Sequence, residues 1–157
     1  MGLESSMFEI EVEAEFSAAH AIMIAGEREP LHGHNWHVVA KVAGEALDGE
    51  GLLCDFHTVE GMLRELTGRF HNRNLNEVSP FDRVNPTAEL VAKHLGDELA
   101  GGLDGALSPH AWVESVSVTE AAGCRATYRP RGGGRGAGSE HGGRGEERAT
   151  GWHGGHQ

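Results

Sequence analysis

The chain opens on a strict alternation of apolar and acidic residues. From Phe8 to Phe16 every second residue is apolar, and each residue between two of them is a glutamate. This alternation is typical of a β-strand with one buried face, because successive side chains in a strand point to opposite faces. We therefore predict a strand from about Phe8 to Ala18, and the same parity places His20 on its apolar face.

A second strand is expected to start near His32, because apolar residues recur at every second position from Trp36 onward. His32 and His34 share the parity of Trp36, so their imidazoles would project to the buried face. If the two strands pair, His20 meets these two histidines at one point.

The connections are less regular. Residues 21–31 are expected to form a loop that ends directly before the histidine pair, and residues 44–51 a turn. Leu52–Cys54 is interpreted as a short buried strand end.

Two helices are expected in the middle of the chain. Asp55 is a suitable N-cap for the first helix, and apolar residues recur every three or four positions after it. The second helix is expected to begin at Asn85-Pro86, because a capping residue followed by proline is typical of a helix start, and to end before Gly101-Gly102. The apolar stripes are Phe56, Val59, Leu63, Leu66 and Phe70 in the first helix, and Leu90, Val91, His94, Leu95 and Leu99 in the second.

Two further strands are predicted at 112–120 and 125–129, separated by a turn. The element order is then strand, strand, helix, helix, strand, strand. This order predicts an α+β domain in which both helices cover one face of a four-stranded antiparallel sheet. Glu120 shares the parity of Val116 and Val118, and a carboxylate on such a face needs a partner with hydrogen-bond donors.

Composition limits the classes of function. The 157 residues suit one domain, expected at 1–130, because residues 131–157 are rich in glycine and arginine and nearly free of apolar residues. We predict that this segment is a disordered tail. The net charge of −11 disfavours nucleic acid as the main partner. No apolar stretch approaches the roughly 20 residues that span a membrane, and signal-peptide features are lacking, so a cytoplasmic location is expected. Cys54 and Cys124 lack a CxxC spacing, which makes a disulfide framework unexpected.

The three histidines are the strongest chemical signal. Three nitrogen ligands without a fourth protein ligand are typical of catalytic zinc, which keeps an open position for water or substrate. The alternative is that His20 is a hydrogen-bonded core histidine, and that His32 and His34 form a polar strand end.

Several motifs, in their order along the chain, resemble the 6-pyruvoyl- and 6-carboxytetrahydropterin synthase family. The resemblance covers roughly Phe8 to Tyr128. The motifs are Phe16-Ser17-Ala18-Ala19-His20, Leu31-His32-Gly33-His34-Asn35, Asp55-Phe56, Leu75-Asn76-Glu77, Asn85-Pro86-Thr87-Ala88-Glu89, Thr119-Glu120 and Gly123-Cys124.

The resemblance implies a tunnelling fold, in which copies of the domain assemble into barrels, commonly as a hexamer. It implies that zinc is the cofactor and that a pterin is the substrate. Glu120 falls on the carboxylate that anchors the pterin ring, and Thr87 and Glu89 are expected near the same pocket. The implied zinc ligands are His20, His32 and His34.

The catalytic positions depart from the commoner family pattern. Arg28 stands where shorter bacterial members have a catalytic cysteine, and Glu29 follows it. This arrangement resembles a subgroup in which glutamate replaces cysteine and the product is 6-hydroxymethyl-7,8-dihydropterin, a folate precursor. The family's Asp-His pair is replaced by His71 and Asn72. Asn72 cannot exchange a proton near neutral pH, whereas His71 is a candidate acid or base.

The leading hypothesis is therefore a zinc-dependent lyase acting on 7,8-dihydroneopterin triphosphate, with Glu29 and His71 as catalytic residues. The first alternatives are 6-carboxytetrahydropterin synthase, which belongs to queuosine biosynthesis, and 6-pyruvoyl-tetrahydropterin synthase. An alternative from a different class is a pterin- or zinc-binding protein without turnover.

Overall fold

The computed structural model describes residues 6–107 and 109–130, and the predicted tail lies outside this part of the chain. Within the described part, no helix is long and apolar enough to cross a membrane. The elements are β1 (Phe8–His20), β2 (Met23–Ile24), β3 (Glu27–Arg28), β4 (His32–Gly44), α1 (Phe56–Gly68), β5 (Arg73–Asn74), the 3-10 helix η1 (Leu75–Glu77), α2 (Ala88–Leu107), β6 (Ala111–Ala121) and β7 (Cys124–Tyr128).

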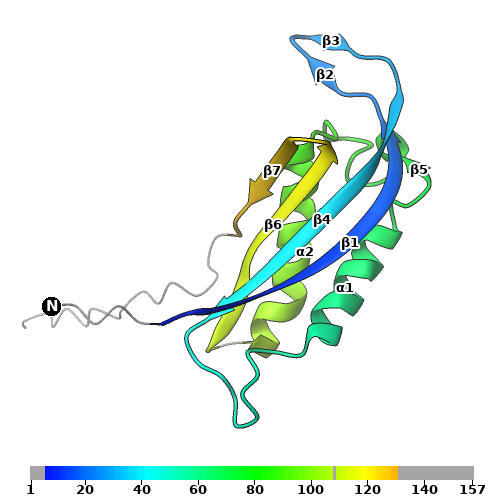
Figure 1. Ribbon diagram of the computed structural model, residues 1–157. Helices are drawn as coiled ribbons and strands as arrows, with labels where there is room; N and C mark the ends of the chain where they lie inside the picture. Colours follow the sequence, from blue (N-terminus) through cyan, green and yellow to red (C-terminus); the bar gives the residue numbers. More distant parts are fainter. Residues whose placement is uncertain (1–5, 108, 131–157) are drawn as a thin grey trace, which may run out of the picture.

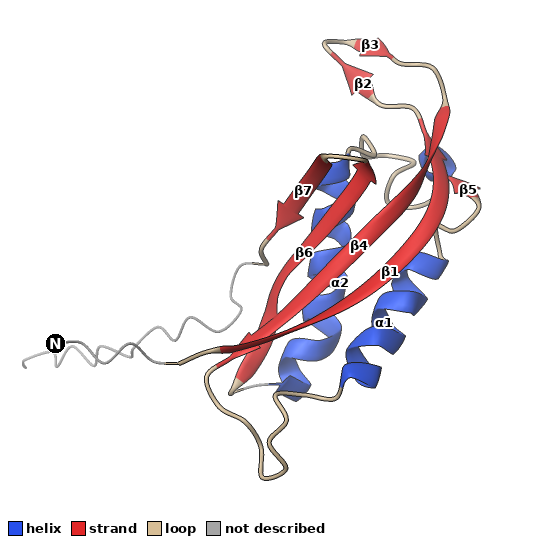
Figure 2. Ribbon diagram, in the orientation of Figure 1, coloured by secondary structure: helices blue, strands red, loops and turns tan. Residues whose placement is uncertain are grey.

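The main sheet has the strand order β5-β1-β4-β6-β7. The four long strands pair antiparallel, as predicted. The sheet has a fifth strand, β5, because Arg73 and Asn74 add a short parallel pairing beside Ala18 and Ala19. Helices α1 and α2 lie side by side against one face of this sheet (Figures 1 and 2). The predicted α+β architecture is confirmed for the single chain, and its assembly into a barrel stays a prediction.

The core lies between the sheet and the two helices. Phe16 and Trp36 face each other across β1 and β4 with their rings stacked at 5.7 Å, and the Trp36 indole N–H donates to the Ala18 carbonyl oxygen at 3.1 Å. The opposite face of the sheet is polar, and there Lys41 pairs with Glu11 at 3.3 Å. The alternation of apolar and acidic residues thus separates a helix-covered face from a charged face.

The first helix is capped by Asp55 as predicted, whereas the second differs from prediction at both ends. Helix α1 begins after Asp55, whose carboxylate accepts the His57 N–H at 2.8 Å, but Phe56 is 50% exposed and the buried stripe starts only at Val59. Helix α2 begins at Ala88, not at Asn85-Pro86, because Thr87 acts as its cap: the Thr87 hydroxyl oxygen accepts the N–H of the third residue after it at 3.2 Å.

Helix α2 also continues past Gly101-Gly102 to Leu107. Glycine costs about 1 kcal/mol in a helix interior relative to alanine. Leu103 and Leu107 offset this cost, because both are buried in the core and extend the apolar stripe.

Two connections between the elements differ from the prediction. Leu52–Cys54 is not a strand: it follows a turn in which the Asp48 carboxylate accepts the N–H groups of Glu50 and Leu52. The expected loop at 21–31 contains the hairpin β2–β3, which projects beyond the end of the sheet (Figure 1). Its turn uses positive φ angles at Ala25 and Gly26, and Ala-Gly is a weaker sequence signal for such a turn than Asn-Gly.

Candidate metal centre and active site

The pairing of β1 with β4 brings the three histidines together. His20 lies directly opposite His32, and Ala18 lies opposite His34, so all three imidazoles emerge at one end of the ladder. One ring nitrogen of each histidine lies within 4.8 Å of the other two. The predicted convergence is confirmed, and in the described part of the chain this is the one cluster with metal-ligand geometry.

Backbone carbonyl groups orient two of the rings. The Nδ1–H of His20 donates to the Pro86 oxygen at 2.8 Å, and the Nδ1–H of His32 donates to the Pro30 oxygen at 2.9 Å. A hydrogen bond from Nδ1 fixes the tautomer, which leaves Nε2 as the unprotonated atom that can bind a metal. Sequence patterns do not reveal these carbonyl partners, because the backbone is common to every residue.

The Nε2 atoms of His20 and His34 are buried, and among the described residues neither has a hydrogen-bond partner. A buried polar atom without a partner costs free energy, and a metal ion removes that cost. Burial also lowers the pKa of His34 below its ordinary value of 6.5, although the Glu120 carboxylate opposes this shift. His34 is therefore neutral at neutral pH, as metal binding requires. These features argue against a merely hydrogen-bonded core histidine.

Glu120 reaches the same point from the end of β6. One of its carboxylate oxygens lies 3.8 Å from Nε2 of His34, and the other lies 4.0 Å from Nε2 of His20. The carboxylate thus faces the two nitrogens that have no hydrogen-bond partner among the described residues. Its predicted position on the apolar parity of β6 is confirmed.

Glu29 approaches the histidines from the other side. Its Oε1 lies 3.6 Å from Nε2 of His32 and accepts the Ile22 N–H at 3.2 Å. Its own backbone N–H donates to the Ile22 oxygen at 3.0 Å, so both ends of Glu29 are tied to one residue. Arg28, the residue before it, is exposed on β3. The acid, and not the arginine, is placed beside the metal centre.

His71 does not join this cluster within one chain. Its Nδ1 accepts the Ser17 N–H at 3.1 Å, three residues along β1 from His20, which is about 10 Å in an extended strand. It borders a cavity of about 600 Å³ that is lined by residues of β1, such as Glu15, and by residues of α1, such as Thr67.

Of the two predicted residues near α2, Thr87 is the one that the chain links closely to the site. Thr87 follows Pro86, whose oxygen holds His20, and Thr87 itself caps α2. Glu89 is exposed in the first turn of α2. No contact of Glu89 with the three histidines is seen in the described residues.

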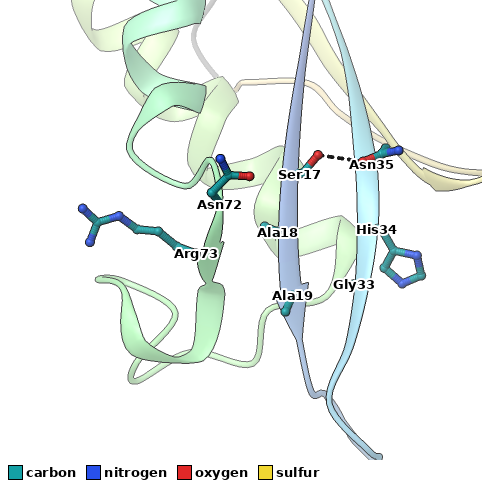
Figure 3. Close-up of a pocket in the computed structure, with 8 residues that line it drawn as sticks. All are labelled: Ser17, Ala18, Ala19, Gly33, His34, Asn35, Asn72 and Arg73. Atoms are coloured by element: carbon teal, nitrogen blue, oxygen red, sulfur yellow. Dashed lines mark hydrogen bonds between the residues drawn. The ribbon is translucent and has the colours of Figure 1, made fainter.

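A second cavity, of about 450 Å³, lies next to the histidine end of the ladder. Figure 3 shows its lining: Asn72 and Arg73 lie on one side of β1, the Ser17 hydroxyl donates to Asn35 Oδ1 at 2.7 Å, and the His34 imidazole points to the far side of β4. The metal centre and this cavity therefore share His34 but open on different sides of the two strands.

The fold and the site together define a class of protein. Three inward imidazoles, two flanking carboxylates and an open ligand position are typical of a metalloenzyme and not of a structural metal site, which is usually closed by four protein ligands. The profile of the 6-pyruvoyl tetrahydropterin synthase family matches residues 9–131. The chain belongs to this family, whose members are lyases, and the histidine cluster is consistent with the family's zinc site.

A curated relative and two solved structures give the range of similarity. The 6-carboxy-5,6,7,8-tetrahydropterin synthase of Bacillus subtilis (strain 168) is 34% identical over 133 residues, covering 81% of this chain and 88% of the relative. The 6-pyruvoyl tetrahydropterin synthase of Caenorhabditis elegans is 21% identical, with a TM-score of 0.69 over 82% of this chain and 99% of that structure. The Plasmodium falciparum enzyme is also 21% identical, with a TM-score of 0.62 over 80% and 98%.

These similarities sharpen the sequence-based hypothesis. They confirm the family and its lyase activity, and they favour the 6-carboxytetrahydropterin alternative over the 6-hydroxymethyl product that was placed first. The glutamate subgroup is a finer assignment than the family match supports.

Proposed function

We propose that this protein is a zinc-dependent lyase that acts on the side chain of 7,8-dihydroneopterin triphosphate, with Glu29 as the general base. The observation that carries the proposal is the position of the Glu29 carboxylate, 3.6 Å from Nε2 of His32, one of the three proposed ligands. A base must lie within hydrogen-bond reach of the proton it removes, and a substrate bound at the open metal position brings its hydroxyl groups to this place.

His20, His32 and His34 would hold the zinc. When bound, zinc supplies a Lewis acid that lowers the pKa of a substrate hydroxyl. The neutral state of His34 and the fixed tautomers of the other two rings keep the three lone pairs available for the metal. The Pro86 and Pro30 carbonyl oxygens hold the ring planes while substrate binds and leaves.

The two carboxylates take different roles. Glu120 anchors the pterin by accepting the adjacent N–H donors of its pyrimidine edge, a paired geometry that suits a carboxylate. Glu29 removes a proton from the side chain. Thr87 and Glu89 remain candidates for substrate contacts at the mouth of the pocket. We assign no step to His71, because its ring nitrogen is committed to Ser17 on another side of the strand.

The product that similarity favours is 6-carboxy-5,6,7,8-tetrahydropterin. A relative that is 34% identical over most of both chains carries that activity. The route would then use Glu29 in place of the cysteine base of other members, because the sequence has arginine at that position. The Plasmodium vivax 6-pyruvoyltetrahydropterin synthase, solved with a catalytic glutamate replaced, indicates that this fold accommodates such a residue.

A second candidate product is 6-hydroxymethyl-7,8-dihydropterin, and the adjacent Arg28 and Glu29 favour it. In a retro-aldol cleavage, Glu29 takes the proton of the second side-chain hydroxyl, the carbon–carbon bond next to it breaks, and the electron pair enters the C6=N5 imine of the ring. The first side-chain carbon then takes a proton, and the phosphorylated two-carbon aldehyde leaves. No oxidant is needed.

Product analysis separates the candidates. Both products keep the same side-chain carbon, as a carboxylate on a tetrahydro ring or as a hydroxymethyl group on a dihydro ring, so chromatography with absorbance detection resolves them. We expect zinc-loaded protein to consume 7,8-dihydroneopterin triphosphate and to release 6-carboxytetrahydropterin. Release of only the hydroxymethyl compound would select the second candidate. No turnover with full zinc occupancy would instead support the non-catalytic alternative.

A further inference from the structure

Two asparagine side chains form hydrogen bonds with the backbone that directly follows His20, a proposed metal ligand. The Ala21 N–H donates to Asn76 Oδ1 at 2.8 Å, and the Ala21 oxygen accepts from Asn76 Nδ2 at 2.8 Å. Two residues further, the Met23 N–H donates to Asn85 Oδ1 at 2.9 Å, and the Met23 oxygen accepts from Asn85 Nδ2 at 3.0 Å. Each amide therefore satisfies both polar backbone groups of one residue, as a neighbouring strand would.

The opposite edge of the same short segment carries Glu29. Ile22 lies between Ala21 and Met23. Alternate residues of an extended chain present their backbone groups to opposite edges. Ile22 donates its N–H to the Glu29 carboxylate at 3.2 Å and accepts the Glu29 N–H at 3.0 Å. Asn76 and Asn85 thus hold one edge of residues 21–23, and this segment holds Glu29 on the other.

Packing holds this segment only at its first residue, because Ala21 is buried and the following hairpin is not. The side chains of Met23 and Ile24 are 44% and 58% exposed, and the hairpin projects away from the helices (Figure 1). The two asparagines come from outside the hairpin, from η1 and from the segment before α2. They are the described side chains from the body of the domain that bond the backbone of residues 21–23. The residue after Asn85 is Pro86, whose oxygen holds the His20 ring.

We propose that Asn76 and Asn85 are positioning residues that aim Glu29 at the metal centre. They touch neither metal nor substrate, and they act through the backbone of residues 21–23. This inference rests on the proposed role of Glu29. The residue type fits the task, because a primary amide offers an acceptor and two donors in one plane, whereas a carboxylate offers only acceptors and alanine offers neither.

The experiment is a double-mutant cycle between Asn85→Ala and Glu29→Gln, with turnover of 7,8-dihydroneopterin triphosphate, zinc content and melting temperature measured for each protein. In the wild-type background we expect Asn85→Ala to lower kcat by about 10- to 100-fold, the size of effect that a misplacement of about 1 Å produces, with zinc retained. In the Glu29→Gln background the same substitution should change kcat by less than about 2-fold, because the group it aims is already gone.

Controls separate positioning from stability. Asp48→Ala removes two side-chain bonds to backbone N–H groups in the loop between β4 and α1, at the other end of the sheet (Figure 1). It should lower the melting temperature without lowering kcat. Asn85→Asp, which keeps the acceptor for the Met23 N–H but sets a carboxylate oxygen against the Met23 oxygen, serves if the alanine variant does not fold, and should lower kcat in the same pattern. Asn76→Ala repeats the test from the other anchor.

The outcomes are distinct. If Glu29→Gln is impaired but Asn85→Ala keeps the wild-type kcat, or if Asn85→Ala costs the same factor in both backgrounds, the positioning role is overturned while the role of Glu29 stands. If Glu29→Gln itself keeps wild-type turnover, the proposed function fails, and the positioning role fails with it. Hydrogen exchange gives a readout without turnover: the Ile22 and Glu29 amides should exchange faster in Asn85→Ala, and unchanged exchange would contradict the inference.

Discussion

The two ends of the β1–β4 ladder are built from the same pairing but are held in different ways. Toward Phe8 the helix-facing positions carry hydrocarbon side chains, and Val38, Ala40 and Val42 are fully buried. Toward His20 the same face carries imidazoles, whose rings are fixed by carbonyl oxygens of Pro86 and Pro30. Burial stabilises without direction, whereas hydrogen bonds fix the positions of particular atoms.

This difference indicates that one end of the ladder stabilises the fold and the other end forms the metal site. The apolar end supplies the free energy of folding, since burying apolar area is its dominant favourable contribution. The polar end forgoes some of that contribution, because two of its ring nitrogens are buried and have no hydrogen-bond partner in the described part of the chain. It gains a ligand set that is in place before the metal arrives. Variants of the apolar end and of the polar end should therefore affect stability and metal binding differently.

Truncating the core should destabilise the protein most. Trp36→Ala removes a fully buried side chain, its stacking on Phe16 and its hydrogen bond to the Ala18 oxygen. We expect a loss of about 3–5 kcal/mol in the free energy of unfolding, measured by urea denaturation of metal-free protein. Leu47→Ala, at a residue that is 38% exposed, is the control and should stay within about 0.5 kcal/mol. A loss below about 1 kcal/mol for Trp36→Ala would contradict the assignment of the core.

Truncating a metal ligand should remove zinc but change the stability of the metal-free protein very little. His34→Ala or His32→Ala should remove most of the roughly one zinc per chain that we expect, because two nitrogens hold zinc far less well than three. For His34→Ala, the metal-free protein should lose less than about 1 kcal/mol, because the Nε2 atom it removes has no hydrogen bond to lose. Elemental analysis and urea denaturation with a chelator measure the two effects. Full zinc occupancy in either variant would refute the metal site.

A smaller effect is expected from pH at a half-buried histidine beside the core. His94 lies edge-on to Phe70 and Phe81, and burial lowers its pKa below 6.5. The unfolded chain therefore binds this proton more readily, so the contribution of His94 to stability is lost as pH falls through about 6.5. His94→Gln should lose less stability than wild type between about pH 7.5 and pH 5.5. Equal losses in metal-free proteins would show that His94 does not contribute.

Removing the tail should have the least effect. Residues 131–157 offer almost no apolar surface for docking onto the domain. A chain that ends at Pro130 is expected to keep the melting temperature and the oligomer size of the full chain. A clear drop in either quantity would show that the tail packs against the domain or supports its assembly.

The sequence predicts much of the metal centre because strand periodicity is a strong signal. Two strands with matching parity were enough to bring His20 to His32, and the parity of β6 placed Glu120 on the same face. The length of α2 was underestimated because local propensity stops a helix at Gly101-Gly102, whereas burial of later leucines continues it.

The positions of individual atoms could not be predicted in the same way. Asn76 and Asn85 bond residues that lie 55 and 62 positions earlier in the chain, and such side-chain-to-backbone contacts leave no periodic trace. His71 shows the same limit: its motif position suggested the active site, and within one chain its Nδ1 accepts the Ser17 N–H on β1, so its catalytic role stays a prediction. Fold follows from pattern here, and the details of the site follow from geometry.

Glu29→Gln is the most direct test of the proposed role of Glu29 as the general base beside the three histidines. Glutamine keeps nearly the same volume and can still accept the Ile22 N–H, but it has lost the basic oxygen. With 7,8-dihydroneopterin triphosphate as substrate, the account predicts that turnover falls by about 10²–10⁴-fold while the zinc content is unchanged. Wild-type turnover in this variant, with zinc in place, would contradict the account and leave Glu29 as a charge in the hairpin without a catalytic role.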